Sequence, residues 1–169
     1  MQKRFILAGV LGVLLLQPAV AAAQKLVFVA RHAERTDEPA RNEPDPSLSS
    51  AGQARAEKLN GMLKDAGVAA IFVSQYRRTQ ETAKPLAATL KLTPQLTPGN
   101  IEDLLGTLKN RHANDVVLIV AHTSTMPGIV KALTGATVTI ADDDYSSLFV
   151  VVPGAPAQPT AGSVVRMRY

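Results

Sequence analysis

The sequence contains no cysteine and no tryptophan, and aromatic residues make up only 4% of its 169 residues. Without cysteine the chain has no disulfide, no thiol nucleophile, no thiolate metal site and no lipid-modified N-terminal cysteine. That composition suits an oxidising compartment. No Lys/Arg run is interleaved with aromatic residues, so base stacking and nucleic-acid binding are not expected. The chemistry has to come from other side chains.

The first residues have the order of a secretory signal peptide. A basic start (Lys3 and Arg4) precedes an apolar run over residues 5–16 and small residues over 19–23. The apolar run is short for a membrane span, and the alanine-rich end suits a peptidase. We therefore predict a signal peptide over residues 1–23, with an uncleaved membrane anchor as the alternative.

Residues 24–169 are predicted to form one domain, with no internal repeat and no second domain. Loss of the two basic residues in the signal lowers the formal charge from +4 to +2. This charge is too mild to indicate a polyanionic partner. We expect a soluble periplasmic or secreted protein without stable membrane insertion.

The pattern of apolar residues indicates an α/β fold. Apolar segments over residues 25–30, 69–73 and 116–121 predict buried strands, separated by segments with helical periodicity. Two more strands are predicted over 148–152 and 164–168, at the edge of the sheet. The alternation predicts a three-layer sandwich, in which helices flank a mostly parallel central sheet.

Four basic residues are expected to meet at one edge of that sheet. Arg31 and His32 end the first strand, His122 follows the third, and Arg78 opens a helix after the second. In open α/β sheets, ligands bind at the carboxyl ends of the strands. Arginine can clamp phosphate oxygens bidentately, and a helix starting just after His122 would direct its N–H groups at an anion. The sequence thus predicts a phosphoryl pocket.

Four segments in order along the chain resemble a known family. They are RHAE (residues 31–34), DPSLSSAGQARA (45–56), SQYRRTQETA (74–83) and VLIVAHTSTMPGIVKAL (117–133). Together they resemble the histidine phosphatase superfamily, which has the phosphoglycerate-mutase-like fold. The resemblance covers most of residues 24–169.

The resemblance implies a role for each matching residue. His32 would be the nucleophile that carries the phosphoryl group, with its other ring nitrogen donating to a backbone carbonyl. Arg31, Arg78 and His122, with Thr123, would bind the phosphoryl oxygens and stabilise their charge. The resemblance implies no metal and no other cofactor. Water would then release phosphate.

Departures from the family narrow this expectation. Mutase members have an Asn where this chain has Glu38, and they carry long insertions. The acid-phosphatase and phytase branch has an Asp where this chain has Thr123. The chain is most similar to the short members of the mutase and phosphohistidine phosphatase branch.

The general acid that protonates the leaving group is left open. Glu102 is the first candidate, since many members use a Glu downstream of the arginine segment. Its alternative interpretation is a first-turn acid in a helix capped by Asn100. Asp103, in the position of a capping box, and Glu34 are further candidates. Without any acid, the substrates would carry good leaving groups, such as phosphohistidine, acyl phosphates or anhydrides.

The sequence thus predicts an exported, metal-independent phosphatase that forms a covalent phosphohistidine at His32. Its substrate would be a phosphomonoester, another small phosphorylated molecule or a phosphoprotein. The alternative is a weakly catalytic phosphate-binding or regulatory module. Residues 35–46 are expected to form a wall of the site, Ser50 to open a capping box, and Asp142–Asp144 to form a solvated turn.

Overall fold

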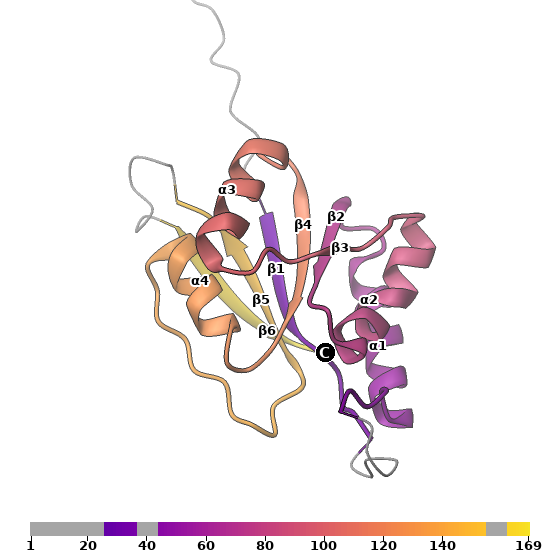
Figure 1. Ribbon diagram of the computed structural model, residues 1–169. Helices are drawn as coiled ribbons and strands as arrows, with labels where there is room; N and C mark the ends of the chain where they lie inside the picture. Colours follow the sequence, from indigo (N-terminus) through magenta and orange to yellow (C-terminus); the bar gives the residue numbers. More distant parts are fainter. Residues whose placement is uncertain (1–25, 37–43, 155–161) are drawn as a thin grey trace, which may run out of the picture.

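The computed structural model describes residues 26–36, 44–154 and 162–169 (Figure 1). The predicted signal peptide over residues 1–23 lies outside these ranges, and so does its boundary with the domain. Residues 37–43 of the predicted wall, including Glu38, also lie outside them. Within the described ranges, no helix has the length and apolar character needed to cross a membrane.

The described strands form one six-stranded sheet with the order β3-β2-β4-β1-β5-β6. The first four strands in this order are parallel, whereas β5 is antiparallel to β1 and β6 to β5. The prediction of a mostly parallel sheet is confirmed, and only the two-residue β3 was not predicted. The strands are β1 (Leu26–Arg31), β2 (Val68–Val73), β3 (Gln95–Leu96), β4 (Val116–Ala121), β5 (Ser147–Val152) and β6 (Ser163–Arg168).

Helices cover both faces of the sheet, two on each side (Figure 1). One pair packs through Leu59 and Leu86 on the face of the sheet that carries Leu118. The other pair packs through Leu104 and Ile129 on the opposite face, which carries Ile119. The predicted three-layer α/β sandwich is therefore confirmed. The helices are α1 (Ser50–Leu63) and α2 (Arg77–Leu90) on one face, α3 (Ile101–Arg111) and α4 (Met126–Thr134) on the other.

The central position of β4 in the sheet explains why its sequence is apolar without alternation. Val117 and Ile119 pack toward α3 and α4, whereas Leu118 and Val120 pack toward α1 and α2. Each of these side chains is at most 1% exposed. A strand buried on both faces needs apolar residues at every position, and this burial fixes the register that carries the site.

The start of α1 packs directly against the segment that follows β1. Ser49, one residue earlier than predicted, caps α1 by accepting a hydrogen bond from the Gly52 amide at 3.1 Å. The Ser49 amide in turn donates to the Glu34 carbonyl oxygen. A Cβ on Gly52 would lie 2.0 Å from that oxygen, so only glycine permits the contact.

Gly52→Ala should therefore destabilise the protein. We expect a loss of about 3 kcal/mol in the free energy of unfolding, because backbone atoms cannot move aside as a flexible side chain would. The matched control is Gly61→Ala in the same helix, where a Cβ would meet no atom within 4 Å. That variant should gain about 0.5 to 1 kcal/mol in urea unfolding. Equal effects of the two substitutions would contradict the packing described for Gly52.

Candidate active site

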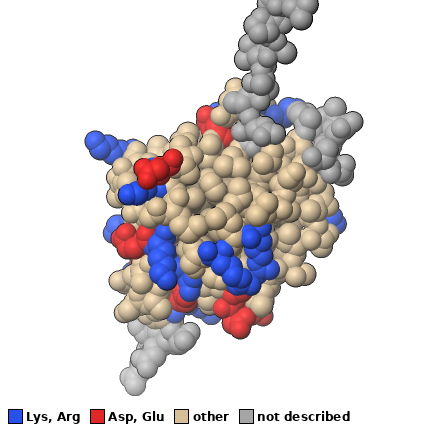
Figure 2. Space-filling model, turned by 180° about the vertical axis from the view of Figure 1, so that it is seen from behind, with Lys and Arg blue, Asp and Glu red and all other residues tan. Residues whose placement is uncertain are grey.

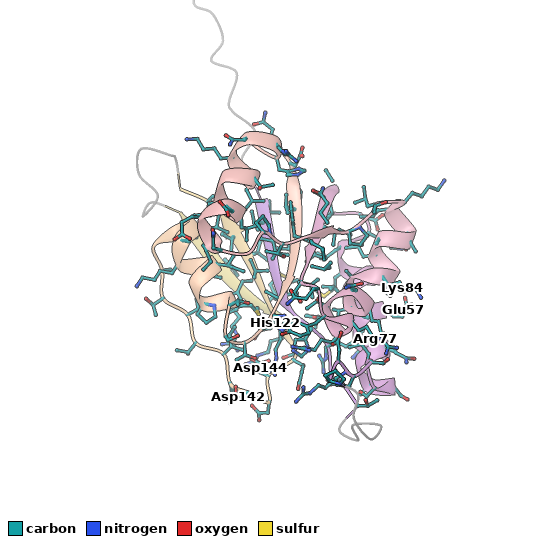
Figure 3. All side chains as sticks on the ribbon, viewed as in Figure 1. Glu57, Arg77, Lys84, His122, Asp142 and Asp144 are labelled. Atoms are coloured by element: carbon teal, nitrogen blue, oxygen red, sulfur yellow. The ribbon has the colours of Figure 1, made fainter. Side chains whose placement is uncertain are left out.

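The two histidines are brought together by the parallel pairing of β1 with β4. Arg31 is in register with Ala121, and the His32 amide donates to the Ala121 carbonyl oxygen at 2.9 Å. The centroids of the His32 and His122 rings lie 5.2 Å apart. Figure 3 shows His122 at the end of β4, with Asp142 and Asp144 on the loop below it. The site thus lies at the carboxyl edge of the sheet, as predicted.

His32 is held in one tautomer. Its Nδ1 lies 2.9 Å from the Ala33 carbonyl oxygen, which can only accept, so Nδ1 carries the proton. The side chain of Thr82 fixes the same peptide segment, since its Oγ1 accepts from the Ala33 amide and donates to the Arg78 carbonyl oxygen. Nε2 of His32 is therefore left with a free electron pair, as the nucleophilic role requires.

Burial keeps His32 neutral. The residue is 7% exposed, and this desolvation lowers its pKa to about 4. The charges of Arg78 and Arg31 and the nearby His122 lower the pKa further, while the hydrogen bond to Ala33 partly opposes the shift. Nε2 is consequently unprotonated at neutral pH.

His122 is oriented by hydroxyl groups behind it. Its Nδ1 lies 3.4 Å from the Arg78 guanidinium, which can only donate, so Nε2 carries the proton and donates to Ser74 Oγ at 2.9 Å. Ser74 lies 2.9 Å from Thr79 Oγ1, which donates to the Tyr76 carbonyl oxygen. This chain of donors fixes the ring with Nδ1 toward Arg78.

The pKa of His122 is also lowered to about 4, first by burial and then by the charges of Arg78 and Arg31. The carboxylate of Asp45 opposes this shift. Without an anion, the site therefore contains two positive guanidinium groups and two neutral imidazoles. A bound phosphate dianion would favour proton uptake by His122, because an opposite charge nearby stabilises the protonated form.

Arg78 is clamped between an acid and an aromatic ring. Its NH1 lies 3.4 Å from the Asp45 carboxylate, and its guanidinium carbon lies 4.1 Å from the centre of the Tyr76 ring. The second oxygen of Asp45 accepts from the Arg77 amide at 2.7 Å, so the carboxylate also anchors the start of α2. These contacts orient the guanidinium plane beside His122.

Arg31 has a structural contact as well as a face on the cleft. Its NH1 donates to the carbonyl oxygens of Ala141, Asp142 and Asp144 at 3.3, 2.7 and 3.2 Å. Its guanidinium carbon lies 3.8 Å from the centre of the Tyr145 ring. NH1 thus holds the loop before β5, which leaves NH2 without a hydrogen-bond partner within the described residues.

All five predicted phosphate-binding residues line one cleft of about 580 Å³. The amides of Thr123 and Ser124, between His122 and α4, have no hydrogen-bond acceptor within the described part of the chain. They are available to an anion at the start of that helix. The cleft is lined by Arg31, His32, Arg35, Tyr76, Arg78, His122, Thr123, Ser124, Thr125, Asp142 and Tyr145.

The three candidates for the general acid lie elsewhere. Glu102 is exposed on the first turn of α3 and does not line the cleft. Asp103 forms the predicted capping contact with Asn100, its amide donating to the Asn100 side chain at 2.8 Å. Glu34 is ion-paired with Arg55 at 2.6 Å; burial alone would raise its pKa, but the hydrogen bonds and charge of Arg55 lower it.

Several residues of the site were not predicted from the sequence. Asp45 and Ser74 stand inside the family-like segments, and their place there was a usable signal. Tyr76 and Thr82 lie in the same region without a pattern of their own. Tyr145, whose ring lies edge-on to His32 with centroids 5.9 Å apart, follows no apolar periodicity and carries no motif.

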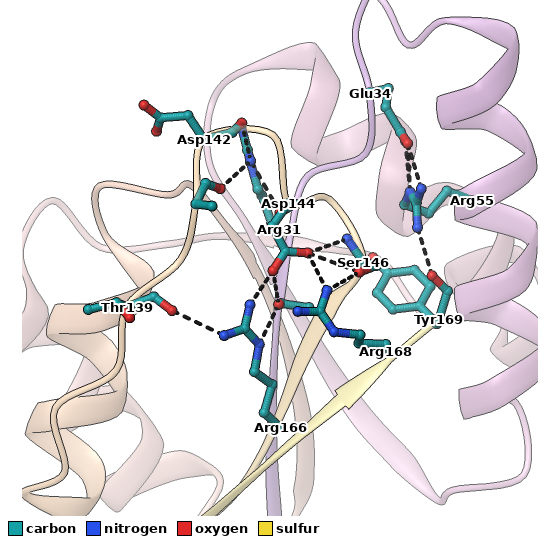
Figure 4. A network of polar contacts seen from close by, with 12 residues as sticks. Arg31, Glu34, Arg55, Thr139, Asp142, Asp144, Ser146, Arg166, Arg168 and Tyr169 are labelled. Atoms are coloured by element: carbon teal, nitrogen blue, oxygen red, sulfur yellow. Dashed lines mark hydrogen bonds and ion pairs between the residues drawn. The ribbon is translucent and has the colours of Figure 1, made fainter.

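The predicted solvated turn at Asp142–Asp144 is wrong for Asp144, whose side chain is only 7% exposed. Its carboxylate accepts hydrogen bonds from Ser146, Ser147, Arg166 and Arg168 (Figure 4). These bonds hold its pKa far below the usual range, although desolvation opposes them. Figure 2 shows Lys and Arg side chains gathered beside acidic ones on the face seen from behind.

No three His, Asp or Glu side chains are grouped as metal ligands within the described ranges. The chemistry that this arrangement supports is anion binding by Arg31, Arg78 and His122 beside an unprotonated nitrogen of His32. That combination fits the transfer of a phosphoryl group to His32.

Comparison with known proteins agrees with the fold. Residues 27–102 match the model of the histidine phosphatase superfamily (branch 1). The structure of the protein histidine phosphatase SixA complexed with tungstate superposes with a TM-score of 0.67 and 18% identity, over 85% of this chain and 96% of that one. A mycobacterial glucosyl-3-phosphoglycerate phosphatase superposes with a TM-score of 0.61 and 13% identity, over 82% and 96%.

A curated relative is similar over a shorter stretch. The PE-PGRS family protein PE_PGRS11 of Mycobacterium tuberculosis (strain ATCC 25618 / H37Rv) is 46% identical over 57 residues, which are 33% of this chain and 10% of the relative. The chain therefore spans only a small part of that protein. Taken with the fold, the family match over residues 27–102 supports membership of the histidine phosphatase superfamily.

The neutral histidines predict a stability that depends on pH. Between pH 6.5 and about 4, unfolded histidine binds a proton that folded His32 and His122 do not. The free energy of unfolding should therefore fall as the pH decreases through this window. His122→Gln removes one of the two histidines, so this variant should lose less free energy of unfolding over the same pH window. Urea unfolding at several pH values measures the free energy of unfolding of the wild type and of the variant. Equal dependence on pH in the two proteins would contradict a neutral His122 in the folded state.

The Asp144 cluster predicts a positioning effect on Arg31. Asp144→Asn places an amide donor among the hydroxyl and guanidinium donors, which should loosen the loop whose carbonyls hold Arg31. We expect the dissociation constant for inorganic phosphate, measured by calorimetry, to rise about tenfold. The neighbouring and exposed Asp143 is the matched control, and Asp143→Asn should bind phosphate as the wild type does. Unchanged binding by Asp144→Asn would contradict the coupling.

Proposed function

We propose that the protein is an exported, metal-independent phosphatase that hydrolyses phosphorylated compounds through a covalent phosphohistidine at His32. The observation that carries this proposal is the state of His32. Its Nδ1 is fixed on the Ala33 carbonyl oxygen and its Nε2 is unprotonated, beside Arg78 and His122. A site that only bound phosphate would not need an unprotonated nitrogen at this position.

The reaction has two steps that balance in atoms and charge. In the first, Nε2 of His32 attacks phosphorus, a P–N bond forms and the bond to the leaving group breaks. Arg31, Arg78 and His122 stabilise the charge on the phosphoryl oxygens. In the second, water attacks phosphorus, the P–N bond breaks and phosphate leaves, with the proton of water passing to the products.

Within the described residues, no acidic side chain is held in the cleft where it could protonate a leaving group. The site therefore favours substrates with good leaving groups. A general acid has to be held within hydrogen-bond reach of the leaving atom. Glu102 does not line the cleft, and Asp142, the one acidic residue that does so within the described ranges, is exposed. Aryl phosphates, acyl phosphates and phosphohistidine need little or no protonation. The name of SixA, a protein histidine phosphatase, supports this class. Glu102 as the acid stays a prediction.

The proposed export is supported by residues 1–23, which have the order of a signal peptide. The absence of cysteine is compatible with the periplasm or the extracellular space. Cell fractionation with an antibody tests it. We expect the shortened protein outside the cytoplasm.

The second candidate is a phosphate-binding or regulatory module with little turnover. The observation that favours it is the lack of a carboxyl group held in the cleft within the described ranges. Such a module would bind phosphate with Arg31 and Arg78 without requiring His32 as nucleophile.

Steady-state kinetics separate these candidates. We expect 4-nitrophenyl phosphate to be hydrolysed at least about 10²-fold faster than ethyl phosphate, since no held acid assists the alkoxide. The activity should persist in the presence of a chelator. His32→Ala should lose about 10³-fold or more of the activity toward 4-nitrophenyl phosphate.

The matched control is His112→Ala. His112 lies at the end of α3, outside the cleft, and pairs with Asp115. It should keep wild-type activity. Phosphate binding without turnover of either substrate would contradict the enzyme and support the binding module. A small difference between the two substrates would instead indicate a working general acid.

A further inference from the structure

A second cleft, of about 280 Å³, adjoins the phosphate cleft. Tyr76, His122 and Thr125 line both clefts, so the two share a wall. The Tyr76 ring stands edge-on to His122, with centroids 5.4 Å apart. The second cleft therefore adjoins the phosphate cleft at Tyr76, His122 and Thr125, and a group bonded to a phosphoryl unit on His32 would enter it beside these residues.

The rim of the second cleft is held by defined contacts. The amide and the hydroxyl of Thr97 both donate to the Val73 carbonyl oxygen, at 2.7 and 3.0 Å. Asn100 caps α3 through its side chain. A Cβ on Gly128 would lie 2.8 Å from Cδ1 of Ile101, so the glycine lets α3 approach α4 closely. The cleft is therefore preformed by the packing of these elements.

The lining of this cleft is uncharged. Its deep wall consists of apolar side chains from α3, β4 and α4, among them Ile101, Leu104, Ile119 and Ile129. Among the described residues, no Lys, Arg, Asp or Glu lines it. Its polar side chains, among them Thr97 and Asn100 at the rim, are uncharged, and His122 on the shared wall is neutral. A charged group would lose its hydration here without finding a partner of opposite charge, whereas the burial of an apolar ring would be favourable.

We propose that this cleft is the subsite for the leaving group, and that it takes an uncharged, ring-sized, mainly apolar group. This rests on the proposed function. A cavity of about 150 Å³ holds a benzene molecule, so the space fits one substituted ring. The subsite thus selects monoesters of phenol-like compounds over charged sugar phosphates or nucleotides.

Aryl phosphates, the class of substrate that this subsite selects, can react at a site without a held general acid. When Nε2 of His32 bonds to phosphorus, the P–O bond to the ring breaks and the aryloxide oxygen keeps the electron pair. The ring spreads that charge, so the oxygen takes its proton from water afterwards and needs no held acid.

Phosphonates test the subsite without turnover, because their P–C bond is not hydrolysed. We expect phenylphosphonate to bind the full chain at least about tenfold more tightly than methylphosphonate in calorimetry. Ile101→Trp fills the cleft and should bring this ratio close to one, while the affinity for methylphosphonate stays within about twofold. Ile101→Ala widens the cleft and should reduce the ratio severalfold.

The matched control is Leu105→Ala on the same helix. Leu105 packs against the same core but does not line the cleft. This variant should keep the wild-type ratio, and thermal unfolding checks that each variant folds. A ratio near one in the wild type, or a ratio unchanged by both Ile101 variants, would overturn the subsite. If the wild type bound neither methylphosphonate nor inorganic phosphate, the phosphoryl site itself would be contradicted.

Discussion

The parallel ladder between β1 and β4 is the constraint on which the site depends. Its register pairs Arg31 with Ala121, and the hydrogen bond from His32 to Ala121 extends it by one residue. Both histidines leave the sheet at this point, with their ring centroids 5.2 Å apart. A shift of one residue would turn every side chain of the strand to the other face. Burial of both faces of β4 prevents that shift, so the hydrophobic core fixes the geometry of the chemical groups.

The second constraint is electrostatic. Two guanidinium groups and two imidazoles share one edge of the sheet, and burial together with the guanidinium charges keeps both imidazoles neutral. Asp45 balances the charge of Arg78, and the loop carbonyls and the Tyr145 ring hold Arg31. The site is thus arranged for an anion before one binds. Such preorganised charge costs no rearrangement during the reaction, which is how enzymes stabilise phosphoryl transfer.

The sequence predicted the elements that burial dictates and missed those that depend on long-range pairing. The uninterrupted apolar runs of β1 and β4 located both strands and, with them, His32 and His122. The two exposed residues of β3 carried no such pattern. Asp144 has the sequence signature of a solvated turn, yet it is buried by Arg166 and Arg168, 22 and 24 residues away. The cap of α1 was misplaced by one residue because Gln53 gives Ser50 the spacing of a capping box, whereas the structure uses Ser49, which accepts from the Gly52 amide. A general acid near the leaving group could not be read from first-turn acids, which the helix dipole favours in any case.

The central claim is that His32 carries the phosphoryl group. Rapid mixing with 4-nitrophenyl phosphate, followed by alkaline quenching and mass spectrometry, tests it most directly. We expect a phosphorylated peptide containing His32, stable in base and lost in acid, that forms at least as fast as steady-state turnover. Turnover without any phosphorylated peptide, or a phosphoryl group on another residue, would contradict the account.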